Sequence, residues 1–311
     1  MGTYPSYIAL SGTGELGERI ARACDLLGDC TVCPRSCHVD RTGGERGYCQ
    51  GGLLPRVSSA GPHFGEEPPL VGRRGSGTIF LTGCNLRCSF CQNYGISQCY
   101  HGDEIPVARL AGQMLSLQQA GCHNLNFVTP THFVPQILAA VGIAAGLGLR
   151  IPLVYNSGGY DLLGTIRLLE GVFDIYMPDA KYGSDDVALA LSDAPDYVRF
   201  NRESMKEMHR QVGDLVTEGG IAKRGLIIRH LVLPEGLAGT EAVMEFIARE
   251  ISPDSYVNVM DQYHPAWRVL DEGHPLYPKL RRRITGREYR EAVELARKAG
   301  LHRGIPFDSC E

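Results

Sequence analysis

The stretch Gly83-Cys84-Asn85-Leu86-Arg87-Cys88-Ser89-Phe90-Cys91 contains three cysteines in the spacing C-x3-C-x2-C, with an aromatic residue directly before the third. Spacing of this kind can bring three thiolates to one face of a metal cluster. A cubane iron–sulfur cluster contains four irons, so three thiolates leave one iron free to bind another ligand. The apolar, β-branched run Thr78–Thr82 immediately upstream predicts a buried strand. We therefore expect the cysteine loop at the carboxyl end of a strand.

These residues resemble the cluster loop of the radical S-adenosylmethionine (SAM) superfamily, and Cys-Gln-Asn at 91–93 is similar to its pyruvate formate-lyase activating-enzyme branch. The resemblance implies that Cys84, Cys88 and Cys91 hold a [4Fe-4S] cluster, that Phe90 lies beside the cofactors, and that the open iron binds SAM. It also implies an electron donor such as flavodoxin or ferredoxin. SAM is then cleaved to methionine and a 5′-deoxyadenosyl radical, which abstracts a hydrogen atom from the substrate.

Two other interpretations of the three cysteines remain open at this stage. A zinc site would need a fourth ligand nearby, for which Cys99 is close enough in the sequence. Alternatively, the thiols are buried without a common ligand. The agreement between the spacing, the aromatic residue and the preceding strand favours iron–sulfur over both.

The composition of the whole chain is that of a globular protein. It has 311 residues, a formal net charge of −4 and 11 cysteines, and this charge gives no general attraction to nucleic acid or to an anionic membrane. It contains neither a signal-peptide pattern nor an apolar run long enough to span a bilayer. We expect a cytoplasmic enzyme whose cysteines are metal ligands in a reducing compartment, with neither membrane nor nucleic acid as a partner.

A second group of cysteines follows a helix predicted for residues 15–29. Cys30, Cys33, Cys37 and Cys49 have the spacing C-x2-C-x3-C-x11-C, with glycines that let the chain turn back before the fourth. Four thiolates can form a closed structural zinc site or hold a second [4Fe-4S] cluster, and scattered free thiols are the remaining alternative. The segment resembles the leader of a subset of activating-enzyme-like proteins. The cysteines without paired spacing are expected to be small apolar filler: Cys24, Cys99, Cys122 and Cys310.

Downstream of residue 77, apolar runs alternate with segments of helical periodicity. Repeated β and α elements predict a parallel sheet with right-handed crossovers, of a length that fits an incomplete barrel. The resemblance implies the same α/β fold, a partial (β/α)6 barrel. We expect a cysteine-rich N-terminal extension (1–76) and a barrel with a C-terminal helix (77–311). The predicted strands are Thr78–Thr82, Asn124–Val128, Pro152–Tyr155, Phe173–Met177, Tyr197–Phe200, Leu226–Leu233 and Val257–Met260.

Helices are predicted from apolar stripes and from capping residues. Ser204–Glu207 and Thr285–Glu288 both match the capping box and predict helix starts, and the last helix would run to Lys298. Residues 61–77 are rich in glycine and proline, so we expect a loop that leads into the first barrel strand. Three stripes with helical spacing predict further helices: residues 107–120, 134–141 and 162–169.

Polar residues at the carboxyl ends of parallel strands meet at one mouth of a barrel. The second predicted strand is followed by Thr129, Pro130, Thr131 and His132, where the resembled family carries Gly-Gly-Glu to contact the SAM amino group. This chain has no acid there. The hydroxyls of Thr129 or Thr131, backbone carbonyls held by Pro130, or His132 are the candidates to accept those hydrogen bonds. Capping a helix is the competing role of Thr131.

The third and fourth predicted strands end in Asn-Ser-Gly-Gly and Met-Pro-Asp-Ala-Lys. The resemblance implies that Asn156, Ser157, Met177 and Asp179 hold a monovalent cation and that Lys181 pairs with the SAM carboxylate. Side chains two apart on an extended segment point to the same side, so Asp179 and Lys181 can face one ligand. A surface ion pair, which is worth little energetically, is the alternative.

Two later residues complete the predicted site. Arg229 lies inside an apolar run, and a buried arginine is costly unless a cofactor carboxylate or a protein acid pairs with it. His264 follows the last predicted strand, and the resemblance implies that it contacts the nucleoside half of SAM. A structural histidine is the alternative.

Fold and cofactor do not name the substrate. The resemblance to the activating-enzyme branch implies hydrogen abstraction from a glycine of a partner glycyl radical enzyme, which would be a protein substrate. An alternative is modification of a small molecule, a peptide or RNA, with the N-terminal cysteine site as an electron relay. A non-catalytic scaffold with zinc in both cysteine groups is the interpretation from another class of protein.

Overall fold

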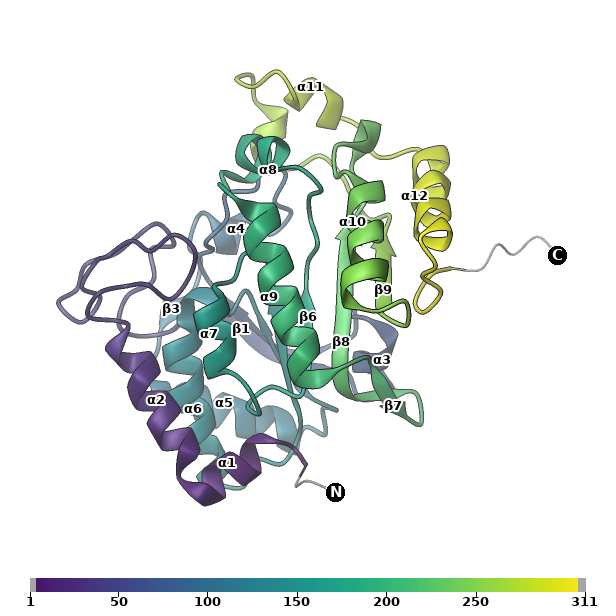
Figure 1. Ribbon diagram of the computed structural model, residues 1–311. Coiled ribbons are helices and arrows are strands. Elements are labelled where there is room, and N and C mark those ends of the chain that lie inside the picture. The colour runs from purple at the N-terminus through teal and green to yellow at the C-terminus, as the bar shows by residue number, and fades with distance from the viewer. Residues whose placement is uncertain (1–3, 307–311) are drawn as a thin grey trace.

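The computed structural model describes residues 4–306, and its centre is a parallel sheet (Figure 1). Six strands run parallel to one another in the order β2, β4, β5, β6, β8 and β9. Five of the seven predicted strands coincide closely with members of this set, and Leu226–Leu233 lies almost wholly within β8. The bounds are Ser76–Leu81 (β2), Leu125–Val128 (β4), Leu153–Ser157 (β5), Ile175–Pro178 (β6), Ile221–Leu231 (β8) and Tyr256–Met260 (β9).

The sheet is open, because within the described residues its two ends do not pair with each other. Further strands extend it beyond its parallel part. Strand β1 (Arg56–His63) pairs antiparallel with β2, and β3 (Asp103–Glu104) pairs with β1. At the other end, β7 (Val216–Glu218) pairs antiparallel with β8. Six parallel strands in an unclosed sheet confirm the expected partial (β/α)6 barrel.

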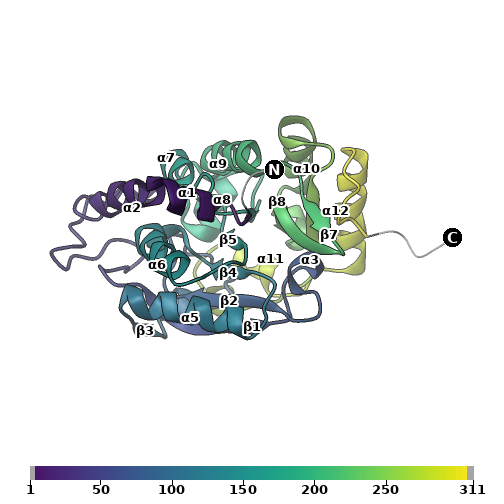
Figure 2. The same ribbon diagram turned by 90° about the horizontal axis from the view of Figure 1, so that it is seen from below.

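Helices cover the outside of the strands. Seen from below, α6, α7, α9, α10 and α12 follow one another around the sheet (Figure 2). Helix α5 is also amphipathic, and its apolar residues Leu110 and Met114 are buried. Within residues 4–306 no helix is long and apolar enough to cross a bilayer. The helix bounds are Tyr7–Thr13 (α1), Glu15–Asp25 (α2), Pro68–Val71 (α3), Tyr94–Ser97 (α4), Val107–Gln119 (α5), Val134–Gly146 (α6), Leu163–Leu168 (α7), Asp185–Ser192 (α8), Tyr197–Val212 (α9), Thr240–Phe246 (α10), Tyr277–Leu280 (α11) and Gly286–Lys298 (α12).

Three local predictions were wrong. The strand predicted at Tyr197–Phe200 is the first turn of α9, and Ser204 is in the middle of that helix, where its hydroxyl donates to the carbonyl of Asn201 at 3.1 Å. The stretch 61–77 is not a simple loop, because it contains the end of β1 and all of α3. By contrast, the capping box at Thr285–Glu288 is present and starts α12, which ends at Lys298 as predicted.

The N-terminal segment packs on the barrel through two helices and a long loop. Helix α2 lies against α6 and α7, with Leu16 and Ala23 buried. The cysteine-bearing loop that follows α2 lies at the left of the molecule in Figure 1. Since β1 continues directly from this segment into the main sheet, the cysteine-rich region and the barrel share one core.

Candidate functional site

The loop after β2 brings the thiols of Cys84, Cys88 and Cys91 together. All three are free cysteines, and each accepts or shares a hydrogen bond. The backbone N–H of Leu86 donates to Cys84 Sγ at 3.4 Å, the hydroxyl of Ser192 donates to Cys88 Sγ at 2.9 Å, and Ser97 Oγ lies 3.2 Å from Cys91 Sγ. Hydrogen bonds of this kind favour the thiolate form. Each of the three sulfur atoms therefore has a polar neighbour.

The surroundings of these thiols fit a cationic metal cluster. Burial raises the pKa of Cys84 to about 12, the neighbouring Cys88 thiol raises it further, and Lys181 opposes the rise. Burial likewise raises the pKa of Cys88, again opposed by Lys181. Burial disfavours the thiolates of Cys84 and Cys88, whereas positive charge from Lys181 or from a bound metal cluster favours them.

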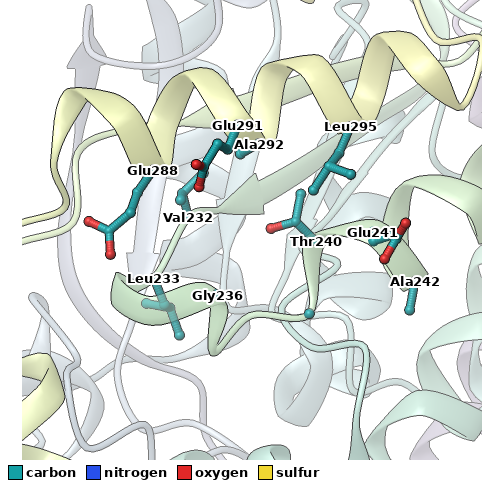
Figure 3. A pocket seen from close by; sticks show the side chains of 11 residues that line it. Val232, Leu233, Gly236, Thr240, Glu241, Ala242, Glu288, Glu291, Ala292 and Leu295 are labelled. Atoms are coloured by element: carbon teal, nitrogen blue, oxygen red, sulfur yellow. The ribbon is translucent and has the colours of Figure 1, made fainter.

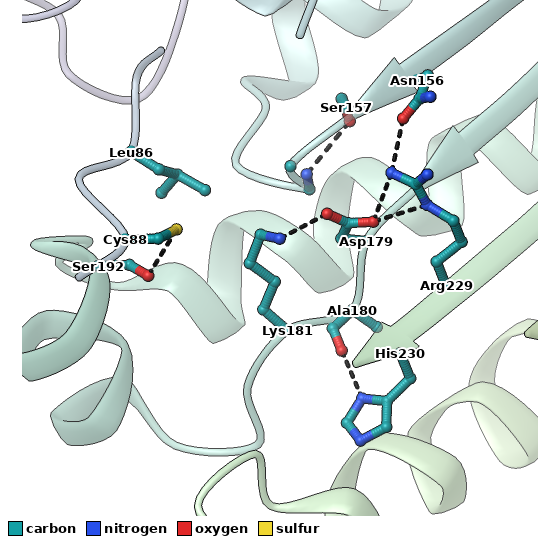
Figure 4. A network of polar contacts seen from close by, with 12 residues as sticks. Leu86, Cys88, Asn156, Ser157, Asp179, Ala180, Lys181, Ser192, Arg229 and His230 are labelled. Atoms are coloured by element: carbon teal, nitrogen blue, oxygen red, sulfur yellow. Dashed lines mark hydrogen bonds and ion pairs between the residues drawn. The ribbon is translucent and has the colours of Figure 1, made fainter. Parts of the chain in front are cut away.

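Lys181 reaches the cysteine loop from an ionic network at the strand ends (Figure 4). Its Nζ lies 2.5 Å from Asp179 Oδ2, and Asp179 Oδ1 accepts from Arg229 Nε at 2.8 Å. Arg229 Nη2 also donates to Asn156 Oδ1 at 2.6 Å. These side chains come from β5, β8 and the turn after β6, so neighbouring parallel strands assemble the network.

The network keeps its groups ionised. Burial opposes charge on Asp179, but Arg229 and Lys181 hold its pKa below the usual range. Burial also opposes charge on Lys181, whereas Asp179 raises its pKa to about 12. Arg229 forms an ion pair with Asp179, which offsets the cost of burying its charge. The alternative of a surface ion pair is wrong, because both side chains of the Asp179–Lys181 pair are less than one-fifth exposed.

The oxygen atoms predicted to bind a monovalent cation accept hydrogen bonds from protein side chains. Asn156 Oδ1 accepts from Arg229, and both oxygens of Asp179 accept from cationic side chains. Ser157 donates to Asp161 at 2.6 Å instead, and Met177 is fully buried. A metal cation here would lie beside a guanidinium and an ammonium group, and the monovalent cation stays a prediction.

The residues after β4 have other partners than those predicted. Thr131 donates to Asp161 at 2.7 Å, and His132 Nε2–H donates to the carbonyl of Thr82 at 2.8 Å. Thr129 has a positive φ of 59°, which is strained for a β-branched residue, and its N–H donates to the carbonyl of Asn156 at 2.9 Å. Thr131 is therefore already paired with Asp161, whereas His132 keeps Nδ1 without a partner, so its role toward SAM stays a prediction.

Two acids that the sequence analysis assigned to a lead-in loop line the barrel interior. Glu67 is 5% exposed, lies 4.0 Å from Arg229, and accepts from Asn258 of β9 at 3.1 Å. Burial raises the pKa of its neighbour Glu66, and Arg229 opposes the rise. Two adjacent acids just before the first barrel strand were the sequence signal that could have identified them.

Helix α9 also contributes residues to the site, which the sequence analysis missed because it predicted a strand at Tyr197–Phe200. The hydroxyl of Tyr197 contacts the carbonyls of Gly158 and Asp179, each at 3.0 Å, and Asn201 Nδ2 donates to the carbonyls of Gly159 and Asp179, each at 2.9 Å. A Cβ at Gly159 would lie 2.0 Å from the Asp179 carbonyl, so only glycine fits there. Helix α9 thus joins the exits of β5 and β6.

The remaining predicted residues are spread around the cysteine loop. Phe90 is buried and packs edge-on against Tyr263, with ring centroids 5.9 Å apart. His264 is partly exposed in the loop after β9. Among the cysteines assigned as filler, Cys122 is buried but Cys24 and Cys99 are exposed, and Cys310 lies outside the described residues. The four N-terminal cysteines, Cys30, Cys33, Cys37 and Cys49, line one cavity of their own.

A second groove lies between α10 and α12 (Figure 3). It carries the carboxylates of Glu241, Glu288 and Glu291, and Glu288 is already bound to Arg282 at 2.7 Å and to the cap of α12. None of the predicted site residues lines this groove.

The fold and the site define a partial α/β barrel with a three-cysteine cluster loop after its first parallel strand. The model of the radical SAM superfamily matches residues 78–247, and the chain belongs to that superfamily. Its members bind a [4Fe-4S] cluster and SAM, and the three free thiols beside Lys181 fit this cofactor pair.

The comparisons also found a relative and solved structures of similar fold. The chain is 33% identical over 295 residues to uncharacterized protein MJ0674 of Methanocaldococcus jannaschii, covering 92% of this chain and 79% of that protein. The [FeFe]-hydrogenase maturase HydG of Carboxydothermus hydrogenoformans is similar in fold, with a TM-score of 0.50, 12% identity, and coverage of 73% of this chain and 52% of HydG. A radical SAM methyltransferase from Sphaerobacter thermophilus gives a TM-score of 0.45 and 15% identity over 75% of this chain and 67% of its own.

Proposed function

We propose that the chain cleaves SAM reductively and that Lys181 binds the SAM carboxylate. The observation that carries this proposal is the position of the Lys181 ammonium group between Asp179 and Cys88. Asp179 uses one of the three N–H donors of Lys181, which leaves donors for a second anion. When bound, the cluster supplies the electron that cleaves SAM, and the resulting deoxyadenosyl group takes a hydrogen atom from the substrate.

The other residues of the network would hold Lys181 in place and exclude water. Asp179 keeps the ammonium group charged and is itself fixed by Arg229, which is anchored on Asn156. Helix α9 fixes the backbone on both sides of Asp179 through Tyr197 and Asn201. A preorganised cation of this kind binds an anionic group without reorganisation at the moment of reaction.

Replacing Lys181 with methionine tests the proposal. A lost charge-assisted hydrogen bond in a buried site costs about 1.5–3 kcal/mol, so SAM should bind about 10- to 100-fold more weakly to Lys181→Met. SAM affinity is measured by anaerobic calorimetry on reconstituted protein, together with 5′-deoxyadenosine release after dithionite reduction. Lys206→Met is the control, because Lys206 is an exposed lysine paired with Glu250. Unchanged SAM affinity in Lys181→Met contradicts the proposal.

For the substrate, we propose a glycine in a partner protein, as in the activating-enzyme branch. The supporting features are Cys-Gln-Asn at 91–93, Asn-Ser-Gly-Gly after β5, and the Asp179–Lys181 pair after β6. Reaction with a panel of peptides carrying deuterium on the glycine Cα would transfer deuterium to 5′-deoxyadenosine. If SAM is cleaved but no peptide of the panel transfers deuterium, the glycine assignment fails while SAM cleavage stands. We also propose flavodoxin or ferredoxin as the electron donor.

A further inference from the structure

The four N-terminal cysteines converge on one cavity. Cys30, Cys33, Cys37 and Cys49 all line it, and all four are free thiols. Three are buried and Cys37 is partly buried. Eleven residues separate Cys49 from Cys37, so a long turn of the chain serves to return Cys49 to the other three cysteines.

The loop is shaped around the sulfur atoms. The N–H of Tyr48 donates to Cys37 Sγ and that of Gly51 donates to Cys49 Sγ, both at 3.4 Å. A Cβ at Gly47 would lie 2.8 Å from Cys37 Sγ, so a larger residue would push the thiol away. Backbone N–H groups aimed at sulfur stabilise thiolates, which are the form that binds metal.

A buried arginine lies against this cavity without an acid to neutralise it. Arg41 is 1% exposed and lines the cavity. It donates to the carbonyls of Gly52 at 2.7 Å and His132 at 2.8 Å, and its Nη1 lies 4.0 Å from Cys30 Sγ. None of these described contacts is a carboxylate. Because a buried charge is costly unless it is paired, the cavity should carry negative charge.

His132 also lies in the wall of the cavity. It is 1% exposed and lines the same cavity. Its Nε2–H donates to the carbonyl of Thr82, whereas its Nδ1 has no hydrogen-bond partner. Nδ1 is a lone-pair acceptor that a cluster with four thiolate ligands does not bind, so the inference below rests on the thiols and on Arg41.

We infer that Cys30, Cys33, Cys37 and Cys49 hold a second [4Fe-4S] cluster and that Arg41 is its buried counter-charge. In residues 4–306 neither cysteine group is arranged around a single metal-ion position, so the choice of metal rests on ligand spacing. Structural zinc sites draw their ligands as two close pairs. This chain instead places three cysteines within eight residues and the fourth far away, as iron–sulfur proteins do.

The second site shares a wall with the SAM-cluster loop. The carbonyl of Cys49 touches Gly83, where a Cβ would lie only 2.4 Å from it. Arg35 Nε donates to the carbonyl of Asn85 at 2.9 Å, and Arg87 Nη2 donates to that of Tyr48 at 2.8 Å. Since four thiolates fill every iron of a cubane, this second cluster has no open iron for SAM.

Iron content separates the two clusters. Reconstituted wild-type protein should contain about eight irons per chain. The iron content should fall by about half in Cys84→Ala/Cys88→Ala/Cys91→Ala and also by about half in Cys30→Ala/Cys33→Ala. Iron is measured by colorimetric assay and Mössbauer spectroscopy, with zinc measured on the same samples. Cys24→Ala, which removes an exposed thiol of α2, should retain all the iron.

The variant that lacks Cys84, Cys88 and Cys91 decides the matter even if Cys30→Ala/Cys33→Ala does not fold. After dithionite reduction it should show the electron paramagnetic resonance signal of one [4Fe-4S]+ cluster. Zinc in place of iron in that variant overturns the inference, and so does the absence of any metal. This readout does not depend on SAM cleavage, so it stands apart from the role proposed for Lys181.

The role of Arg41 is tested by measuring the midpoint reduction potential of the cluster. In the same three-alanine background, Arg41→Gln should shift the midpoint potential of the remaining cluster to a more negative value, because a buried positive charge favours the reduced state. Arg46→Gln is the control, since Arg46 is an exposed arginine paired with Glu104, and it should leave the potential unchanged. Equal potentials in the Arg41 and Arg46 variants overturn the assignment of Arg41 as counter-charge.

Discussion

The two cysteine loops differ in how their charges are balanced. Beside Cys88, the cation is Lys181, and Asp179 neutralises it from within the protein. Beside Cys30, the cation is Arg41, and its described contacts are carbonyls and a thiol. The first loop therefore has a self-sufficient ion pair, whereas the second needs an anionic occupant to balance its arginine.

The number of cysteine ligands and the charges around them decide which of the two neighbouring sites can bind a cosubstrate. A loop with three cysteines at the mouth of a parallel sheet has an iron and a cation available for a cosubstrate. A loop with four cysteines leaves no open iron, and its neighbouring cation, Arg41, is buried. The two loops lie in close contact, because a Cβ at Gly83 would lie 2.4 Å from the carbonyl oxygen of Cys49.

The largest expected effect comes from removing the three-cysteine loop alone. Cys84→Ala/Cys88→Ala/Cys91→Ala should lower 5′-deoxyadenosine formation at least about 1000-fold, because the cofactor carries the chemistry. Formation is measured by chromatography after anaerobic reduction in the presence of SAM. Cys99→Ala, at an exposed position outside both groups, should keep wild-type activity. Full activity in the three-alanine variant would contradict the assignment of these cysteines.

The sequence predicted the barrel well because its parallel strands are buried on both faces and appear as short apolar runs. It failed at Tyr197–Phe200, where an aromatic and β-branched run starts a helix. There, tertiary contacts decide the conformation: Tyr197 is fully buried and its hydroxyl bonds to the exits of β5 and β6. Local propensity does not contain that information.

The site shows the same division. Asp179 and Lys181 are two residues apart on an extended segment, so their common direction could be predicted. Glu67 and Asn258 are 191 residues apart, and Arg41 meets the carbonyl of His132 across 91 positions. Such pairs depend on the packing of distant elements, and a single sequence carries no signal for them.

The contact between the two loops can be broken with one methyl group. Gly83 has a φ of +80°, and a Cβ there would lie 2.4 Å from the backbone carbonyl of Cys49. Backbone strain and overpacking together should lower the free energy of unfolding of Gly83→Ala by about 2–4 kcal/mol. Urea denaturation of the reconstituted protein measures the change.

Gly44→Ala is the matched control for Gly83→Ala. Gly44 also has a positive φ, of +93°, but nothing lies within 4 Å of the added Cβ. It should therefore lose only the cost of backbone strain, about 1 kcal/mol. Equal losses at the two positions would show that the contact between the loops contributes nothing to stability.

The smallest effect concerns His230, which contrasts with His132. His230 is buried with both ring nitrogens bonded: Nδ1–H donates to the carbonyl of Ala180 at 2.7 Å, and the Thr240 hydroxyl donates to Nε2 at 2.9 Å. Burial lowers the pKa of His230 to about 4. Between about pH 6.5 and 4 the unfolded chain binds a proton that the folded chain does not, so stability should fall as the pH drops through this window.

Replacing His230 with glutamine removes this titration. Between pH 7 and pH 5 the wild type should lose about 2 kcal/mol more free energy of unfolding than His230→Gln, as measured by urea denaturation at a series of pH values. Parallel pH dependence in the two proteins would contradict a buried neutral His230. The iron content of His230→Gln should stay at the wild-type level, because both ring nitrogens already have protein partners. His132 differs, because its Nδ1 has no hydrogen-bond partner among the described residues.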